Sequence, residues 1–203
     1  MAYRSLTGVL LVGGASRRFG SPKALALLDG ETLAARAWRL LGEVCDERLA
    51  VGKQADAPEL PFPLLDDGTV VRAPLAGIVA GLRAAAHDVA VVLPVDCPLL
   101  DAPALRSLAA ACRDAAVPQT GPLPGAYARS ALPVLERRLA AGQLRLRDAL
   151  AELETVVVQL DPQMLVNVNE AADLARLARG PGSLDPSRTP THPGDAERVA
   201  RES

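Results

Sequence analysis

Runs of apolar residues alternate with amphipathic segments along the first half of the chain. The run from Leu6 to Val12 is rich in β-forming residues and stops at a glycine-rich loop, so it predicts a buried strand. Apolar residues at helical spacing predict a helix from Glu31 to Val44. Residues 47–51 and the run from Val89 to Val95 predict two further strands, of which the second is the clearest central strand. The pattern is typical of a chain in which strands and helices alternate.

The middle of the chain continues this alternation. The segment from Pro74 to Ala86 predicts a helix with proline in its first turn, where the missing N–H is tolerated. Asp101 is placed to cap the next helix, which extends to about Cys112. Residues 126–128 predict a short strand, and residues 130–140 predict a helix.

The last part of the chain is less regular. Residues 156–160 and 164–168 have strand character, and Asn169 is placed to cap a final helix that extends through Leu177. Residues 180–203 are rich in Pro, Gly, Ser, Thr and charge, with almost no apolar side chains. Such a segment cannot bury enough surface to offset its ordering entropy, so we expect it to be disordered.

These elements predict an α/β fold. We expect a single Rossmann-like three-layer domain over residues 1–179, with a mostly parallel sheet, and a disordered C-terminal tail over residues 180–203. In sheets of this kind, ligands bind beyond the carboxyl ends of the strands. The loops that follow Val12 and Val95 both lie at such ends, and both carry chemically active residues.

Composition narrows the function classes. Hydrophobic residues make up 49% and aromatic residues 2%, so the core must be built from Leu, Val and Ala. The net charge of −2 does not favour a surface that binds nucleic acid. The three cysteines form no metal-binding pattern and predict reduced thiols in a cytoplasmic protein. The N-terminal apolar run is too short to span a membrane.

The loop from Gly13 to Lys23, GGASRRFGSPK, predicts a phosphate-binding site. Gly13 and Gly14 allow the backbone to approach a ligand closely and to present N–H groups to phosphate oxygens. Arg17 and Lys23 add positive charge for a polyphosphate. The loop matches neither the P-loop nor the GxGxxG pattern. A solvated turn, in which the glycines serve only the geometry, is the alternative interpretation.

Acidic residues follow two of the apolar stretches. Asp96 comes directly after the clearest strand, with no basic residue adjacent in sequence to neutralise it. A carboxylate there is costly to bury unless it is paired or bound to a metal, so Asp96 is a candidate Mg²⁺ ligand. Asp66 or Asp67 could also face a ligand, although a plain Asp-Gly turn is the alternative for Asp67.

Four segments carry these residues in a fixed order: LLVGGASRRFGSPKAL, APLAGIVAGL, PVDCP and NVNEAADL. Over residues 6–177 they closely resemble the signatures of the molybdenum cofactor guanylyltransferases. The wider nucleotidyltransferase superfamily resembles the first segment only loosely. The chain departs from the family pattern at Phe19, where Met is usual. It also departs in the short segment 117–127, which lacks a His-Pro pair.

The resemblance implies a Mg²⁺-dependent transfer of GMP from GTP to the terminal phosphate of molybdopterin, or of molybdenum-molybdopterin, with release of pyrophosphate. It also implies molybdenum insertion proteins and molybdoenzymes as partners. A cytidylyltransferase for the same cofactor is the nearest alternative, although those relatives tend to carry Ala-Ala-Gly in place of Val12-Gly13-Gly14. A sugar-phosphate nucleotidyltransferase and a non-catalytic nucleotide-binding protein are the others. The presence of both Lys23 and Asp96 argues against the last.

The resemblance also implies roles for individual residues. The nucleotide-binding residues would be Leu11, Val12, Gly13, Gly14, Lys23 and Asp96, together with Asp66 or its rival Asp67. The catalytic residues would be Lys23, Arg17 and Asp96, with Asp96 as the metal ligand. Asn167 and Asn169 would face the acceptor. A further family asparagine, after the second strand, has no counterpart near Val51-Gly52.

Overall fold

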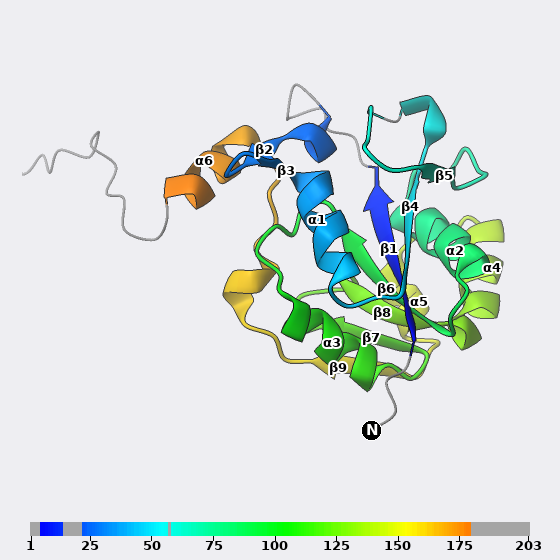
Figure 1. Cartoon of the computed structure of the whole chain (residues 1–203). Coiled ribbons are helices and arrows are strands. Elements are labelled where there is room, and N and C mark those ends of the chain that lie inside the picture. The colour runs from blue at the N-terminus through cyan, green and yellow to red at the C-terminus, as the bar shows by residue number, and fades with distance from the viewer. Residues whose placement is uncertain (1–4, 14–21, 57, 180–203) are drawn as a thin grey trace, which may run out of the picture.

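A single central sheet with helices on both faces forms the body of the molecule (Figure 1). The computed structural model describes residues 5–13, 22–56 and 58–179. The C-terminal segment 180–203, which we expect to be disordered, lies outside the described residues. No helix in the described part of the chain has the length and hydrophobicity needed to cross a bilayer.

The large sheet contains seven strands: β1 (Leu6–Val12), β4 (Glu47–Gly52), β5 (Leu64–Asp66), β6 (Val89–Pro94), β7 (Ala115–Pro118), β8 (Gly125–Ala128) and β9 (Thr155–Val158). Two short strands, β2 (Leu27–Leu28) and β3 (Glu31–Thr32), form a separate hairpin. The helices are α1 (Leu33–Gly42), α2 (Pro74–Ala84), α3 (Ala102–Ala111), α4 (Leu132–Ala140), α5 (Leu146–Leu150) and α6 (Ala171–Arg179).

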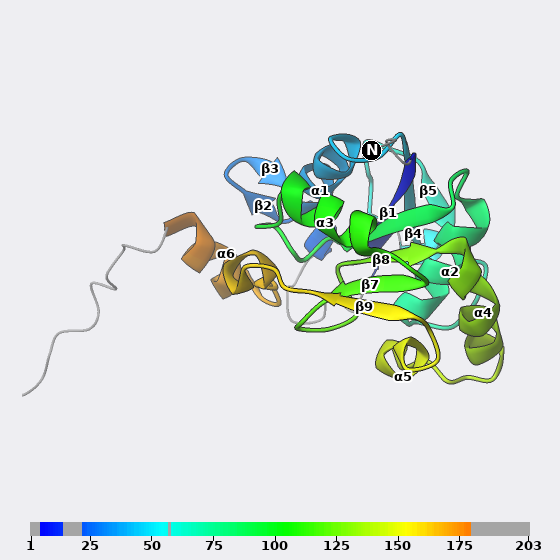
Figure 2. The same cartoon turned by 90° about the horizontal axis from the view of Figure 1, so that it is seen from below.

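The strand order is β5-β4-β1-β6-β8-β7-β9. Strand β8 is antiparallel to its neighbours β6 and β7, and the other pairings in this sheet are parallel. This topology confirms the predicted α/β fold with a mostly parallel sheet. Helix α6 lies at the side of the molecule, beside the β2–β3 hairpin (Figures 1 and 2).

Both faces of the sheet are buried. Along β1, Leu10 packs with α1 and α3 in one apolar cluster, whereas Val9 and Leu11 pack with α2, α4 and α5 in another. All seven residues of β1 are buried, which explains why its sequence is a continuous apolar run rather than an alternating one. As the composition predicts, the two clusters consist mostly of Leu, Val and Ala.

Several predicted boundaries differ from the structure. Helix α1 begins at Leu33 rather than Glu31, because the Thr32 side chain accepts a hydrogen bond from the Ala35 N–H at 3.1 Å and so caps the helix. The predicted strand at residues 164–168 is wrong, since Pro162–Leu165 forms a 3₁₀ turn.

The predicted cap at Asp101 is confirmed, and its carboxylate accepts from the Ala104 N–H at 2.8 Å. At the start of α6, by contrast, the Asp173 carboxylate accepts from the backbone N–H groups of Asn169 and Glu170 at 2.7 and 2.9 Å. An acidic residue inside the first turn therefore holds this helix end.

Gly52, the last residue of β4, pairs with Val12 at the end of β1. A Cβ atom at Gly52 would lie 2.0 Å from the Val12 carbonyl oxygen, which is backbone and cannot rotate away. We expect Gly52→Ala to lower the free energy of unfolding by about 1–3 kcal/mol, as overpacking does. Chemical denaturation measures this.

Gly13→Ala is the matched control, because a Cβ there meets no described atom within 4 Å. Its stability should stay within about 0.5 kcal/mol of wild type. Equal stability losses in the two variants would contradict the close approach at Gly52.

Candidate functional site

An open cleft of ≈ 920 Å³ lies at the carboxyl ends of the parallel strands. Its walls come from the ends of β1, β4 and β6, from the loop after β5 and from the first turn of α2. This is the edge at which α/β sheets bind ligands, because the connections to the helices diverge there and leave a crevice. Gly13 and Lys23 from the first predicted loop therefore line the same cleft as Asp96 from the second.

An ion pair joins two of the predicted residues at one side of the cleft. Lys23 Nζ lies 3.2 Å from Asp96 Oδ2, and the two side chains are 17% and 27% exposed. The residues are 73 positions apart in the chain. No basic residue is adjacent to Asp96 in sequence, but the fold supplies Lys23 as its partner.

The loop after β6 is tied to the segment before α6. The backbone carbonyl of Asp96 accepts a hydrogen bond from the Val168 N–H at 2.9 Å. Cys97 Sγ lies 3.0 Å from Asn167 Oδ1 and 3.7 Å from Asp96 Oδ1. Burial, reinforced by the negative charge of Asp96, raises the pKa of the Cys97 thiol, so the thiol stays protonated. The thiol is therefore a hydrogen-bond donor and not a nucleophile.

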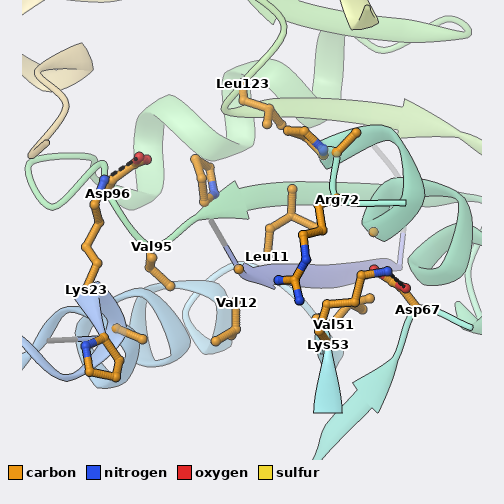
Figure 3. A pocket seen from close by; sticks show the side chains of 18 of the residues that line it. Leu11, Val12, Lys23, Val51, Lys53, Asp67, Arg72, Val95, Asp96 and Leu123 are labelled. Atoms are coloured by element: carbon orange, nitrogen blue, oxygen red, sulfur yellow. Dashed lines mark hydrogen bonds and ion pairs between the residues drawn. The ribbon is translucent and has the colours of Figure 1, made fainter. Parts of the chain in front are cut away.

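A second ion pair lies at the other side of the cleft. Lys53 Nζ lies 2.5 Å from Asp67 Oδ1 and also donates to the Thr69 carbonyl. Figure 3 shows this pair and the Lys23–Asp96 pair well separated, with the Arg72 side chain extending between them. Lys53 and Arg72 were missed by the sequence analysis. The available signal was their position, since one follows β4 directly and the other precedes α2 by two residues.

The two neighbouring acidic residues Asp66 and Asp67 have different surroundings. Asp67 lines the cleft, where its side chain is 7% exposed. Asp66 is exposed, and its two carboxylate oxygens accept from the Gln54 and Gly68 N–H groups, both at 2.8 Å. These two hydrogen bonds lower the pKa of Asp66. Asp67 Oδ1 also accepts from the Thr69 N–H at 3.2 Å, so both carboxylates hold the turn, and of the two residues Asp67 lines the cleft.

The remaining predicted residues divide into three groups. Leu11, Val12, Gly13 and Asn167 line the cleft. Asn169 is not among the residues that line it, and its backbone N–H is bonded to Asp173. Gly14 and Arg17 lie outside the described residues. At Gly13 no atom of the described residues lies within 4 Å of where a Cβ would stand, so the described part of the chain leaves room for a ligand to approach the backbone.

The acidic groups of the cleft fit a particular kind of metal site. No cluster of three or more His, Cys, Asp or Glu side chains in the described part of the chain could hold a metal ion alone. Mg²⁺, however, is commonly held by one or two carboxylates together with water and substrate phosphates. The single carboxylate of Asp96, beside Lys23, fits a Mg²⁺ ion that a polyphosphate would help to hold.

Known proteins resemble this chain over most of its length. Residues 8–156 match the family described as the MobA-like NTP transferase domain. A protein of Deinococcus radiodurans named "Probable molybdenum cofactor guanylyltransferase" is 38% identical over 190 residues, covering 89% of this chain and 98% of the relative. A protein of Burkholderia ambifaria named "Molybdenum cofactor guanylyltransferase" is 35% identical over 197 residues, covering 86% and 96%.

A solved structure is also similar over nearly its whole length. It is the molybdopterin-guanine dinucleotide biosynthesis protein A of Archaeoglobus fulgidus, with a TM-score of 0.73 and 25% identity. The similarity covers 85% of this chain and 97% of that one.

The different surroundings of Asp66 and Asp67 predict different effects of their substitution. Asp66→Asn should lower the melting temperature at neutral pH and leave nucleotide binding unchanged, because Asp66 serves the turn. Asp67→Asn should weaken nucleotide binding roughly tenfold, as expected for loss of one charge-assisted hydrogen bond. Calorimetric titration with a nucleoside triphosphate and thermal melting measure the two effects.

The stability effect of Asp66→Asn should also depend on pH. A lowered pKa means that the carboxylate stabilises the fold above its unfolded pKa of about 3.9, and that this stabilisation is lost as pH falls through the folded value. The difference in melting temperature should therefore be largest near neutral pH and disappear in strong acid. A difference that grows on acidification would contradict the role of Asp66.

Proposed function

Because the chain belongs to the MobA-like NTP transferase family, we propose that it transfers GMP from GTP to the terminal phosphate of molybdopterin. The products are pyrophosphate and the guanine dinucleotide form of the cofactor. The observation that carries the proposal is the Lys23–Asp96 pair in the cleft, beside the open backbone at Gly13. A cation for phosphate, a carboxylate for metal and an accessible glycine backbone are what nucleotidyl transfer requires.

The strand order gives the cleft two ends. Asp67 follows β5 and Asp96 follows β6, and these strands are separated by β4 and β1. Three strand spacings correspond to about 14 Å, which suits one nucleotide laid across the sheet edge. We infer that the phosphates lie toward Lys23 and Asp96 and that the base lies toward Asp67 and Lys53.

The base end suits guanine. Guanine presents two neighbouring donors, N1–H and the 2-amino group, next to the O6 acceptor. The carboxylate of Asp67 can accept from both donors, and the ammonium of Lys53 can donate to O6. Cytosine has a single amino donor on the corresponding edge, so it would make one hydrogen bond fewer to the carboxylate than guanine does.

The reaction itself is a displacement at phosphorus. An oxygen of the acceptor's terminal phosphate forms a bond to the α-phosphorus of GTP, and the bond from that phosphorus to the bridging oxygen of the pyrophosphate breaks. Lys23 neutralises charge on the departing pyrophosphate, and Arg17 assists. The Gly13 backbone and Asn167 hold the two substrates in register, because positioning and charge stabilisation supply most of the rate enhancement in such transfers.

Asp96 is the residue that would hold Mg²⁺. When bound, the ion supplies positive charge to the phosphate oxygens as charge builds up during transfer. The same carboxylate also orients Lys23 through their ion pair.

Base selection tests the assignment of GTP. With both nucleotides at equal concentration and molybdopterin as acceptor, we expect incorporation of GMP to exceed that of CMP by at least tenfold. Mass spectrometry of the dinucleotide product measures the ratio. Predominant incorporation of CMP would instead identify the chain as a cytidylyltransferase for the same acceptor.

Substitution of Asp96 tests the proposed metal ligand. Asp96→Asn keeps the shape of the side chain but removes its charge, so we expect turnover to fall by two or more orders of magnitude, about 3 kcal/mol. A titration of rate against Mg²⁺ should show a raised requirement for the ion. Lys23→Ala should weaken both nucleotide binding and turnover without a comparable shift in that requirement.

The Lys23–Asp96 ion pair also determines the expected effect of Asp96→Asn on folding. Because Lys23 neutralises Asp96, removal of the Asp96 charge should not stabilise the protein, and melting should show an unchanged or slightly lower temperature. Normal turnover with a normal Mg²⁺ requirement in Asp96→Asn would exclude Asp96 as the ligand.

A further inference from the structure

Cys97 joins two parts of the cleft that lie 70 residues apart in the chain. The side chain is 5% exposed and belongs to the core cluster that contains Val95 and Leu100, yet it also lines the cleft. Its sulfur faces two oxygens, Asn167 Oδ1 at 3.0 Å and Asp96 Oδ1 at 3.7 Å. A buried thiol between the proposed metal ligand and a residue of the acceptor side has no role in the mechanism described above.

We propose that Cys97 is a positioning residue that orients the amide of Asn167 toward the acceptor. This inference rests on the proposed function. A thiol carries one hydrogen, and both of its neighbours are oxygens, so it donates to one of them at a time. The nearer oxygen is that of Asn167.

The orientation of Asn167 follows from this contact. Asn167 is exposed, and an exposed amide is otherwise able to rotate between its two faces. With Oδ1 turned to the thiol, the Nδ2 group is turned away from it and can present its N–H donors to the cleft. Donors are the groups needed to bind a phosphate oxygen of the acceptor.

The surrounding backbone makes Cys97 a fixed anchor. Asp96, the neighbour of Cys97, accepts through its carbonyl from the Val168 N–H at 2.9 Å, and Val168 is fully buried. Val168 packs with Leu28, Leu33 and Leu174. Both the thiol and the backbone of Asn167 are therefore held in place, and the amide rotation is the one freedom that the thiol contact removes.

The two carboxylate oxygens of Asp96 have different neighbours. Oδ2 faces Lys23 at 3.2 Å, and Oδ1 faces the thiol. The thiol thus lies between the carboxylate assigned to the metal and the amide assigned to the acceptor, and it donates to the amide. We expect its loss to affect the acceptor more than the nucleotide.

Two isosteric variants separate the donor from the packing. Cys97→Thr retains a hydrogen-bond donor, whereas Cys97→Val has the same shape and lacks one. We expect Cys97→Val to raise KM for molybdopterin by roughly three- to tenfold, the effect of one neutral hydrogen bond, with KM for GTP within about twofold of wild type. Cys97→Thr should restore the KM for molybdopterin.

Further variants control for changes in core packing. Cys112→Val alters another buried thiol of the same core cluster, away from the cleft, and should change neither KM. If the β-branched variants at Cys97 fail to fold, Cys97→Ser and Cys97→Ala provide the same comparison of donor and no donor.

A double-mutant cycle with Asn167→Ala decides whether Cys97 acts through the amide. In that background Cys97→Val should add no further rise in KM for molybdopterin, because the group that it orients is gone. Additive effects, or an equal rise in the KM values of both substrates, would overturn the positioning role and leave the proposed function intact. A wild-type protein that transfers no nucleotide to molybdopterin would overturn the proposed function and the positioning role with it.

Discussion

Burial of the central strands on both faces is the constraint on which the rest of the structure depends. Every residue of β1 is buried, as are all but the last of β6, and helices cover both sides of the sheet. Charged groups have no place inside such a layer, because their desolvation is not repaid. They collect beyond the strand ends, where the loops open into a crevice. The location of the cleft is therefore a consequence of how the core is built.

Charges gathered at this edge must be compensated before a ligand arrives. Lys23 pairs with Asp96 and Lys53 pairs with Asp67, so both cationic side chains are held in place by carboxylates. The Lys23–Asp96 pair is partly exposed, and such pairs contribute little to stability. Separation of the two side chains therefore costs little, so in the proposed reaction Lys23 would be able to exchange its carboxylate partner for phosphate oxygens of the nucleotide. The Lys23–Asp96 ion pair therefore holds the Lys23 side chain in position and still allows it to change partner.

The acceptor side of the cleft is attached to the nucleotide side through the backbone and through one thiol. The Asp96 carbonyl binds the Val168 N–H, and the Cys97 thiol meets the Asn167 amide. A transfer between two large substrates requires their reacting atoms to be held within a few tenths of an ångström, because small misplacements are costly in rate. Hydrogen bonds between the two segments provide that precision.

The sequence by itself determined the fold class and the edge of the sheet that carries the chemistry. Continuous apolar runs identify buried parallel strands, and the residues that directly follow them, Gly13 and Asp96, lie in the cleft because of chain direction alone. Two short elements escaped prediction, the four-residue strand β7 and the five-residue helix α5.

Contacts between distant segments were decided only by the tertiary structure. Nothing near Asp96 in sequence indicates Lys23 as its partner, and nothing near Cys97 indicates Asn167. The difference between Asp66 and Asp67 likewise depends on tertiary structure, because the backbone N–H groups of Gln54 and Gly68 bind the Asp66 carboxylate. Local patterns report how a residue relates to its neighbours along the chain. The partners of a charge are set by strand order, because that order brings separate loops to the same edge.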